Sequence, residues 1–236
     1  CFPPDSTDQV VETIHSDYAL HEMSMKIHSV ELATAPLASP SLPTKSSALD
    51  QVARMLQAGK VYRREDLAQV SNAVDRHLRE LVSGGALKRL AQGLYYVPKK
   101  SVFGVLPPDD QELVATFLRD KDFLVFSPSS YNTLGLGTSQ LYNKTLVYNR
   151  KRHGIFSFGN RQFDFRVKPR FPKKLTPEFL LVDAINNLDE LAEDKNQVLQ
   201  MVERKLTGFD QSKLKRAVSD YGSVATKKRF MRWLNA

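Results

Sequence analysis

The sequence has few of the residues that build disulfide-stabilised or membrane-spanning proteins. Its one cysteine, Cys1, excludes an internal disulfide bond. No apolar run approaches the roughly 20 residues that a transmembrane helix needs, and residues 1–46 have neither the basic start nor the apolar centre of a signal peptide. The composition therefore predicts a cytoplasmic protein without a membrane partner.

Motifs of common catalytic sites are also absent. Three of the five histidines lie within residues 1–46, and the other two, His77 and His153, show no metal-ligand spacing. Gly135-Leu136-Gly137 lacks the further glycine of a dinucleotide-binding loop, and no Gly-x4-Gly-Lys-Ser/Thr motif is present. Asp183 is flanked by core residues on a predicted helix, where we expect a structural hydrogen bond. We therefore predict no metal, no cofactor, no catalytic residue and no enzymatic activity.

Positive charge is abundant but unevenly distributed. The chain contains 34 lysines and arginines against 26 acids, a net charge of +8. Residues 1–46 contain six acids and two lysines and carry −4, so residues 47–236 carry +12. Such a surface attracts polyanions or an acidic protein partner. The first 46 residues mix acids, Ser, Thr and Pro with little periodicity, which predicts a flexible leader, with a short amphipathic helix at Val10–Leu20 as the alternative.

Residues 48–85 show the pattern of three short helices. Apolar residues at i, i+3, i+4 and i+7 predict a first helix over 49–56 that ends toward Gly59, where a left-handed cap is favourable. A brief second helix is expected around 64–69, followed by the short interval that a helix-turn-helix requires. Ser71 is a favourable N-cap for the third helix, whose apolar residues fall on one side.

The other side of the third helix and the segment after it provide polar groups suited to DNA. Asn72, Arg76 and Arg79 can form two-point hydrogen bonds to base edges in a major groove. Two short strands are expected between residues 86 and 97, with basic residues available to phosphates. This order predicts a winged helix-turn-helix DNA-binding domain over residues 47–102. The predicted DNA-binding residues are Ser71, Asn72, Arg76, Arg79, Lys88, Arg89, Gln92, Lys99 and Lys100.

Residues 103–236 indicate a second, mixed α/β domain. Gly104–Pro108 is expected to be a linker, because Pro107-Pro108 stops regular structure, and Asp109 is expected to cap a helix. A short helix capped by Ser129 and further helices from Thr176 to the end are predicted, with strands at 123–126, 145–148, 155–158 and 163–167. The predicted fold class is α+β: a winged helix-turn-helix followed by a small sheet that C-terminal helices cover.

Within this second region, basic residues concentrate in one segment. Residues 144–174 contain ten Lys or Arg and a single acid, Asp164, and carry +9. This charge indicates a second polyanion-binding surface or a partner-docking surface, with a merely solvated strand face as the alternative. The candidate residues of this second basic surface are Lys144, Arg150, Lys151, Arg152, Arg161, Arg166, Lys168 and Arg170.

Several stretches, taken in order, resemble one known family. The segment Arg89–Lys100 (RLAQGLYYVPKK), continuing to Phe103–Pro108 (FGVLPP), resembles the AbiEi-like antitoxins of abortive-infection, type IV toxin-antitoxin systems. Residues 129–136, 176–184 and 221–234 extend the resemblance, so that it covers roughly residues 47–236. The motifs are short and mostly structural, and their order carries the weight.

The resemblance implies a transcriptional repressor that is also an antitoxin. It implies a winged helix that binds repeats in the double-stranded DNA of its own promoter, and a C-terminal domain that counters a nucleotidyltransferase-like toxin. No enzymatic activity is implied. Placed on this sequence, the implied DNA contacts are Asn72, Arg76, Arg79, Lys88 and Arg89. The resemblance implies no particular toxin-facing residues.

Two other classes of function fit parts of the sequence. A non-enzymatic interaction module would use the winged helix and the basic 144–174 surface to bind protein or RNA, because a polar helix face is often merely solvated and many winged helices dock protein. A nucleic-acid-processing enzyme that uses Asp164 or Asp183 is the least favoured hypothesis, since no nucleophile-base pair accompanies these acids. The sequence predicts neither the operator nor the oligomeric state.

Overall fold

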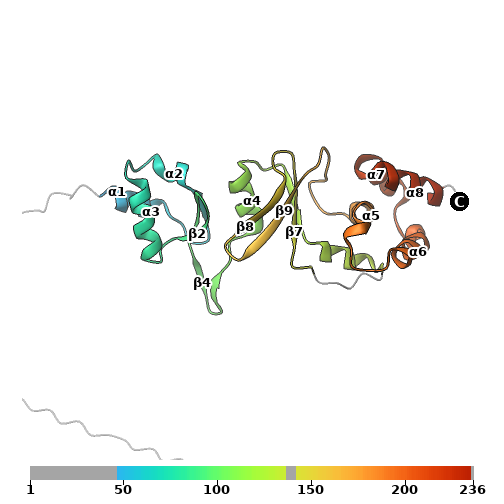
Figure 1. The fold of residues 1–236 in the computed structure, drawn as a ribbon, viewed down its shortest axis with the longest axis horizontal. Helices are drawn as coiled ribbons and strands as arrows, with labels where there is room; N and C mark the ends of the chain where they lie inside the picture. Colours follow the sequence, from blue (N-terminus) through green and yellow to red (C-terminus); the bar gives the residue numbers. More distant parts are fainter. Residues whose placement is uncertain (1–46, 137–141, 235–236) are drawn as a thin grey trace, which may run out of the picture. The chain divides into compact units, whose positions relative to one another are not determined.

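A computed structural model of the chain describes residues 47–136 and 142–234 (Figure 1). The predicted leader, residues 1–46, lies outside the described residues. The described part is a mixed α+β fold with small sheets and a helical C-terminal third, which confirms the α+β class, whereas the winged helix-turn-helix stays a prediction. Its residues belong to one compact unit.

The N-terminal part contains three helices and a three-stranded antiparallel sheet of order β1-β3-β2. The helices pack on a small core of Val52, Leu67, Val74, Leu78 and Leu87. In chain order the elements are α1 (Ala48–Met55), β1 (Val61–Arg63), α2 (Arg64–Ala68), α3 (Val74–Ser83), β2 (Lys88–Ala91) and β3 (Leu94–Tyr96).

Local details of this part correct the sequence-based expectations. Helix α1 is capped by Ser47 and ends at Met55, and Gly59, with a φ of 87°, lies in the turn before β1 instead of at the helix end. Residues 61–63, which were not expected to be a strand, pair with β3, because residues 94–96 provide their hydrogen bonds. Ala73, not Ser71, is the N-cap residue of α3.

The expected linker, residues 104–108, provides one strand of a second hairpin, and its other strand lies within the predicted winged-helix domain. β4 (Lys99–Ser101) pairs with β5 (Gly104–Leu106), and regular structure stops at Pro107-Pro108 as predicted. The Ser101 hydroxyl donates to the Gly104 carbonyl at 3.0 Å and accepts the Phe103 N–H at 3.2 Å, and Gly104 has a φ of 108° that favours glycine. The Tyr96 hydroxyl donates to the Leu106 carbonyl at 2.7 Å and holds the base of the hairpin.

The second part contains a four-stranded sheet of order β6-β7-β9-β8, in which β7 and β9 are parallel and the other pairs antiparallel. Asp109 caps the helix that precedes this sheet, as predicted. The short 3-10 helix after β6 is capped by Ser127 and not by Ser129. The elements are α4 (Asp110–Leu118), β6 (Phe123–Phe126), η1 (Pro128–Leu134), β7 (Thr145–Asn149), β8 (Gly154–Phe158) and β9 (Arg161–Val167).

The two faces of this sheet pack against different partners. Phe163 and Phe165 of β9 face α4, and the outer side of the N-terminal sheet joins the same core through Leu94 and Tyr96. Leu146 and Tyr148 of β7 face the C-terminal helices. Figure 1 shows α4 on one side of the sheet and α5 to α8 on the other. Both faces of the sheet are therefore covered.

The C-terminal helices complete the second core. Thr176 caps the first of them as predicted, and its residues 179–185 are all buried. No helix within the described residues is long and apolar enough to span a membrane. The elements are α5 (Pro177–Asn186), η2 (Leu188–Glu190), α6 (Lys195–Lys205), η3 (Leu206–Gly208), α7 (Gln211–Tyr221) and α8 (Val224–Leu234).

Candidate nucleic-acid interface

Helix α3 has a buried side and a polar, exposed side. Val74 and Leu78 pack in the N-terminal core, in keeping with helical spacing. Arg76 and Arg79 are exposed on the opposite side, and Asn72 is exposed in the turn that precedes the helix. The structure therefore places the three predicted base-reading residues where solvent reaches them.

A buried polar cluster connects the turn before α3 to Arg76. Ser71 is buried, and its Oγ accepts the Ala73 N–H at 3.2 Å and lies 2.8 Å from Nδ1 of the buried His77. Arg76 Nη2 lies 3.5 Å from His77 Nε2. A histidine protonated on Nδ1 satisfies both contacts, donating to Ser71 and accepting from Arg76. Ser71 thus supports the interface from inside, and its burial argues against the predicted direct contact with DNA.

Sequence reasoning missed the role of His77. Its place between Arg76 and Leu78 carries no motif, and helical spacing alone assigns it neither to the polar side nor to the core. Its partner Ser71 lies in a turn whose geometry the sequence does not specify. The signal that was available is weak: a serine and a histidine six residues apart across a predicted helix start.

An ion pair also holds the first turn of α3. The Arg64 guanidinium binds the Asp75 carboxylate with two hydrogen bonds of 2.7 and 2.6 Å, a fork geometry that orients both groups. The hydrogen bonds from Arg64 lower the pKa of Asp75. Arg79 donates to the Asp75 carbonyl at 3.3 Å. Arg64 is neutralised locally, whereas Arg76 and Arg79 have no ion pair within the described residues.

The start of α1 and the turn between α2 and α3 border a hollow of about 550 Å³. Ser47 and Leu49 line it from α1, and Asn72, Arg76 and Glu80 line it from the α3 side. The hollow is open to solvent and mixed in polarity, which is unlike the mostly apolar pockets that hold small ligands. We regard it as part of the surface around the turn.

The β2–β3 hairpin presents the second group of predicted contacts. A two-residue turn at Gln92-Gly93, with a φ of 70° at Gly93, joins the strands, and the register shifts between Arg89 and Ala91. Lys88, Arg89 and Gln92 are exposed, while Leu90 is buried. Leu90 packs in the core shared with the second sheet and Tyr95 packs against the core of the three helices, so the exposed Lys88, Arg89 and Gln92 are the groups of this hairpin that a partner can reach.

Lys99 and Lys100 do not belong to this hairpin. They lie on β4, in the separate hairpin that extends into the expected linker, and both are exposed. The predicted set of nine DNA-binding residues is thus divided: Asn72, Arg76 and Arg79 lie at α3, Lys88, Arg89 and Gln92 on the β2–β3 hairpin, Lys99 and Lys100 on β4, and Ser71 in the interior.

The predicted second basic surface is mostly ion-paired. Lys144 and Arg166 bind Asp164 at 2.8 Å each, and Arg166 also binds Glu190. Two of the other cations contact aromatic rings, Arg152 over Phe117 at 4.9 Å and Lys168 over Tyr148 at 5.2 Å. The remaining pairs are Arg150–Asp122, Lys151–Asp120, Arg161–Asp110 and Arg170–Asp220. Acids from elsewhere in the chain therefore neutralise most of the +9 of residues 144–174.

Asp183 forms the buried hydrogen bonds that its sequence context predicts. The Tyr131 hydroxyl donates to Oδ2 at 2.7 Å and the Tyr148 hydroxyl donates to Oδ1 at 2.9 Å, while Asn187 donates to the Tyr148 oxygen at 3.2 Å. Burial raises the pKa of Asp183, and the two tyrosine hydrogen bonds oppose that rise. This cluster joins β7, η1 and α5. The described residues contain no group of three or more His, Cys, Asp or Glu arranged to hold a metal.

Comparison with known proteins supports the fold alone. No family model matches the chain, and no curated protein matches its sequence. Among solved structures, the chain is similar to the crystal structure of the RV2827C protein from Mycobacterium tuberculosis, with a TM-score of 0.50 and 17% identity, over 79% of this chain and 74% of that one. At this identity the likeness carries no statement about function.

Proposed function

We propose that residues 47–102 form a winged helix-turn-helix domain that binds duplex DNA sequence-specifically, and that the protein represses transcription as the antitoxin of a toxin-antitoxin pair. In this proposal α3 is the recognition helix and the β2–β3 hairpin is the wing. No enzymatic step is involved. The observation that carries the proposal is the exposed Asn72, Arg76 and Arg79 at a helix that follows a short helix and turn and precedes a basic hairpin.

The order of elements supports this assignment. A recognition helix that enters a major groove needs a rigid support and a free outer side, and α3 has both. Asn72 and Arg76 suit adenine and guanine edges, respectively, because each can form two hydrogen bonds to one base. The Ser71–His77 contact and the Arg64–Asp75 pair hold the start of α3 and so limit the ordering cost of binding.

The charge of the same region supports phosphate contacts. Lys88 and Arg89 on the proposed wing have no ion pair within the described residues, so their charges remain available. Cations of this kind release counterions when they meet phosphates, which makes binding strongly salt-dependent. Lys99 and Lys100 on β4 are likewise without an ion pair in the described part of the chain and can extend the phosphate contacts.

The antitoxin part of the proposal is supported by the family resemblance of residues 89–108 and of the C-terminal helices. It carries the expectation of a nucleotidyltransferase-like toxin as partner and of action in the cytoplasm. The alternative module, which binds protein or RNA through the basic 144–174 surface, gains no support from the ion pairs that occupy most of those cations.

A DNA-binding measurement tests the proposal. Fluorescence anisotropy of the full chain with a labelled duplex from its own upstream region, and with a shuffled duplex of equal length, gives the specificity ratio. Arg76→Ala/Arg79→Ala should weaken specific binding at least about 30-fold, since each two-point base contact contributes about 1–3 kcal/mol.

The matched control is Lys173→Ala/Lys174→Ala, which removes two exposed positive charges far along the chain. It should change the dissociation constant for DNA less than about threefold, because it alters only the long-range electrostatic potential of the protein. Site-specific binding that survives in Arg76→Ala/Arg79→Ala would refute the assignment of α3. Wild-type binding that is indifferent to DNA sequence would favour the interaction module.

A further inference from the structure

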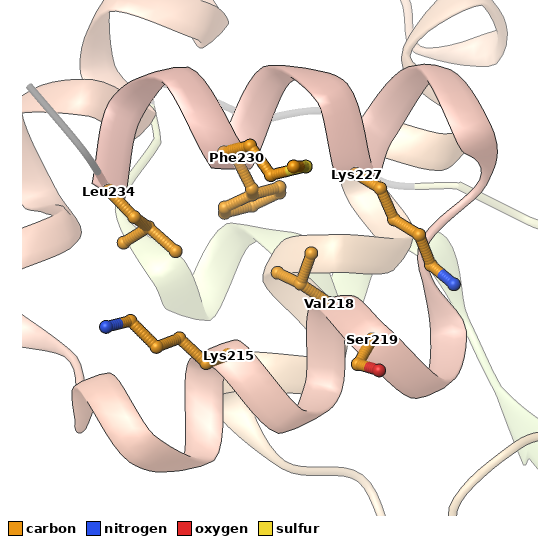
Figure 2. A pocket seen from close by; sticks show the side chains of 7 residues that line it. Lys215, Val218, Ser219, Lys227, Phe230 and Leu234 are labelled. Atoms are coloured by element: carbon orange, nitrogen blue, oxygen red, sulfur yellow. The ribbon is translucent and has the colours of Figure 1, made fainter.

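Helices α7 and α8 enclose an apolar hollow of about 330 Å³ between their exposed sides (Figure 2). Its floor is formed by Val218 of α7 and by Phe230 and Leu234 of α8. Met231, whose side chain is 60% exposed, borders the opening. A hollow with an apolar floor and an exposed apolar residue at its rim is typical of surfaces that bind another molecule.

The hollow is built by a rigid connection between the two helices. The chain turns at Gly222, where a Cβ atom would lie 2.6 Å from the Val218 carbonyl oxygen, so any larger residue would force the turn to shift. Asn186 of α5 accepts the Ser223 N–H at 2.8 Å and donates to the Tyr221 carbonyl at 2.9 Å, holding both sides of the turn. The α7–α8 spacing is therefore fixed without a bound partner.

Cations surround the hollow. Residues 211–234 contain seven lysines and arginines and one acid, Asp220, which pairs with Arg170 and Arg216. Lys215 and Lys227 line the hollow, and Figure 2 shows them at opposite ends of it, Lys215 beside Leu234 and Lys227 beside Ser219. Within the described residues neither lysine has an ion pair. An occupant must therefore be apolar in its middle and acidic at both ends.

We propose that this hollow, the α7–α8 groove, binds an amphipathic helix of a partner protein that carries acidic residues on both sides of an apolar face. The lining residues recur at i, i+3, i+4 and i+7 on α8, from Lys227 to Leu234, a length of about two helical turns. Helices dock into grooves between two helices through apolar residues at the same spacing.

Two other occupants fit less well. A fatty acid has one carboxylate and would leave one of the two end lysines without a counter-charge. A nucleic acid would engage the cations, but Phe230 is buried and offers no exposed ring face on which a base could stack. The proposal is independent of DNA binding by the N-terminal part, because no residue of the groove belongs to that part.

The test uses the full chain and a defined probe. A capped, dye-labelled synthetic peptide of about three helical turns, with leucines at i, i+3, i+4 and i+7 and glutamates at both ends, is titrated by fluorescence anisotropy at physiological salt. A peptide of the same composition in scrambled order is the reference. Trp233, the single tryptophan, packs edge-to-face against Phe230 with ring centroids 5.3 Å apart, so its fluorescence reports on the groove through Phe230.

The substitutions Lys215→Glu/Lys227→Glu should weaken binding of this peptide at least tenfold. The variant that carries them should instead bind a peptide with lysines in place of the glutamates. The matched control, Lys228→Glu/Arg232→Glu, reverses two exposed charges of α8 outside the groove and should weaken binding less than threefold. Met231→Ser keeps every charge and should weaken binding three- to tenfold. This variant tests the proposal even where a charge-reversal variant fails to fold by circular dichroism.

Four results would overturn the proposal. The first two are equal affinity for the ordered and scrambled peptides, and an equal loss of peptide affinity in the groove and control variants. The third is saturable binding of decanoate that displaces the peptide. The fourth is displacement of the peptide by a DNA or RNA oligonucleotide whose own binding is weakened to the same extent by Lys215→Glu/Lys227→Glu. Self-association of the wild type that the same variant abolishes, seen by size-exclusion chromatography, would assign the groove to a second copy of this chain.

Discussion

Two regions of the molecule are rich in cations and use them differently. Around α3 and the β2–β3 hairpin, Arg76, Arg79, Lys88 and Arg89 have no ion pair within the described residues. In the segment 144–170, nearly every cation contacts an acid or an aromatic ring. The segment with the higher charge in the sequence therefore has the less available charge in the fold.

The difference follows from the position of each region in the fold. The 144–170 segment forms β7, β8 and β9. The acids from elsewhere that pair with it come from the start of α4, from the turn between α4 and β6, from η2 and from α7. The register of the parallel β7–β9 pair places Asp164 beside Leu146, on the face that the C-terminal helices cover, so Arg166 reaches Glu190. Charges on a covered face must be paired.

The largest expected effect tests the covered ion pair. Arg166 and Asp164 side chains are 14% and 13% exposed, so Arg166→Met leaves Asp164 with Lys144 as its remaining counter-charge. We expect a loss of about 3 kcal/mol in the free energy of unfolding, measured by urea denaturation. Lys173→Met, at an exposed cation, should change it by less than about 0.5 kcal/mol. A loss below 1 kcal/mol in Arg166→Met would remove the distinction between the two regions.

The pH dependence of the same variant sharpens this test. Burial acts to raise the pKa of Asp164, but hydrogen bonds from Arg166 and Lys144 outweigh it and lower the pKa below the usual 3.8. A carboxyl whose folded-state pKa is lowered stabilises the fold above its unfolded value, and this contribution is lost as the pH falls through the folded value. Arg166→Met should therefore show a smaller loss of stability between pH 5 and pH 2, about the range in which such groups titrate.

Elements with local signals were predictable from the sequence. Asp109 and Thr176-Pro177 fixed the starts of α4 and α5, because a capping side chain acts within one helical turn. The exposure of Arg76 and Arg79 followed from helical spacing alone. Val167 shows the limit of such patterns: it alternates in step with the buried Phe163 and Phe165, yet it is 49% exposed at the end of β9.

Features that depend on distant partners were not predictable. Strand β1 exists because β3 pairs with it, and the β4–β5 hairpin is held by Tyr96 and by the Ser101 side chain. The burial of Ser71 depends on His77, and the neutralisation of Arg150 and Lys151 depends on acids about 30 residues earlier in the chain. Sequence patterns indicate local geometry, but they do not indicate which residues far apart in the chain come into contact.

A smaller effect is expected at the proposed wing. Lys88→Ala/Arg89→Ala should weaken DNA binding about tenfold and reduce the slope of log affinity against log salt by about 2, since each phosphate contact contributes about 0.9 to that slope. Arg150→Ala/Lys151→Ala removes the same charge from ion-paired positions and should leave the slope unchanged. Equal slopes in the two variants would show that pairing does not decide which cations meet DNA.

The smallest effect is expected where an ion pair is exposed to solvent. Arg150 and Asp122 are joined at 3.1 Å, but their side chains are 59% and 47% exposed, and Arg150 also lies over the Phe171 ring at 5.6 Å. Solvent screens such pairs, so Arg150→Gln should reduce the free energy of unfolding by less than about 1 kcal/mol. A double-mutant cycle with Asp122→Asn, measured at low and high salt, separates the ion pair from the ring contact, because only the former is screened. A coupling energy above about 2 kcal/mol at high salt would mean that the exposed Arg150–Asp122 pair stabilises the fold about as strongly as the covered Arg166 pair. Solvent exposure would then not determine the strength of the ion pairs in this sheet.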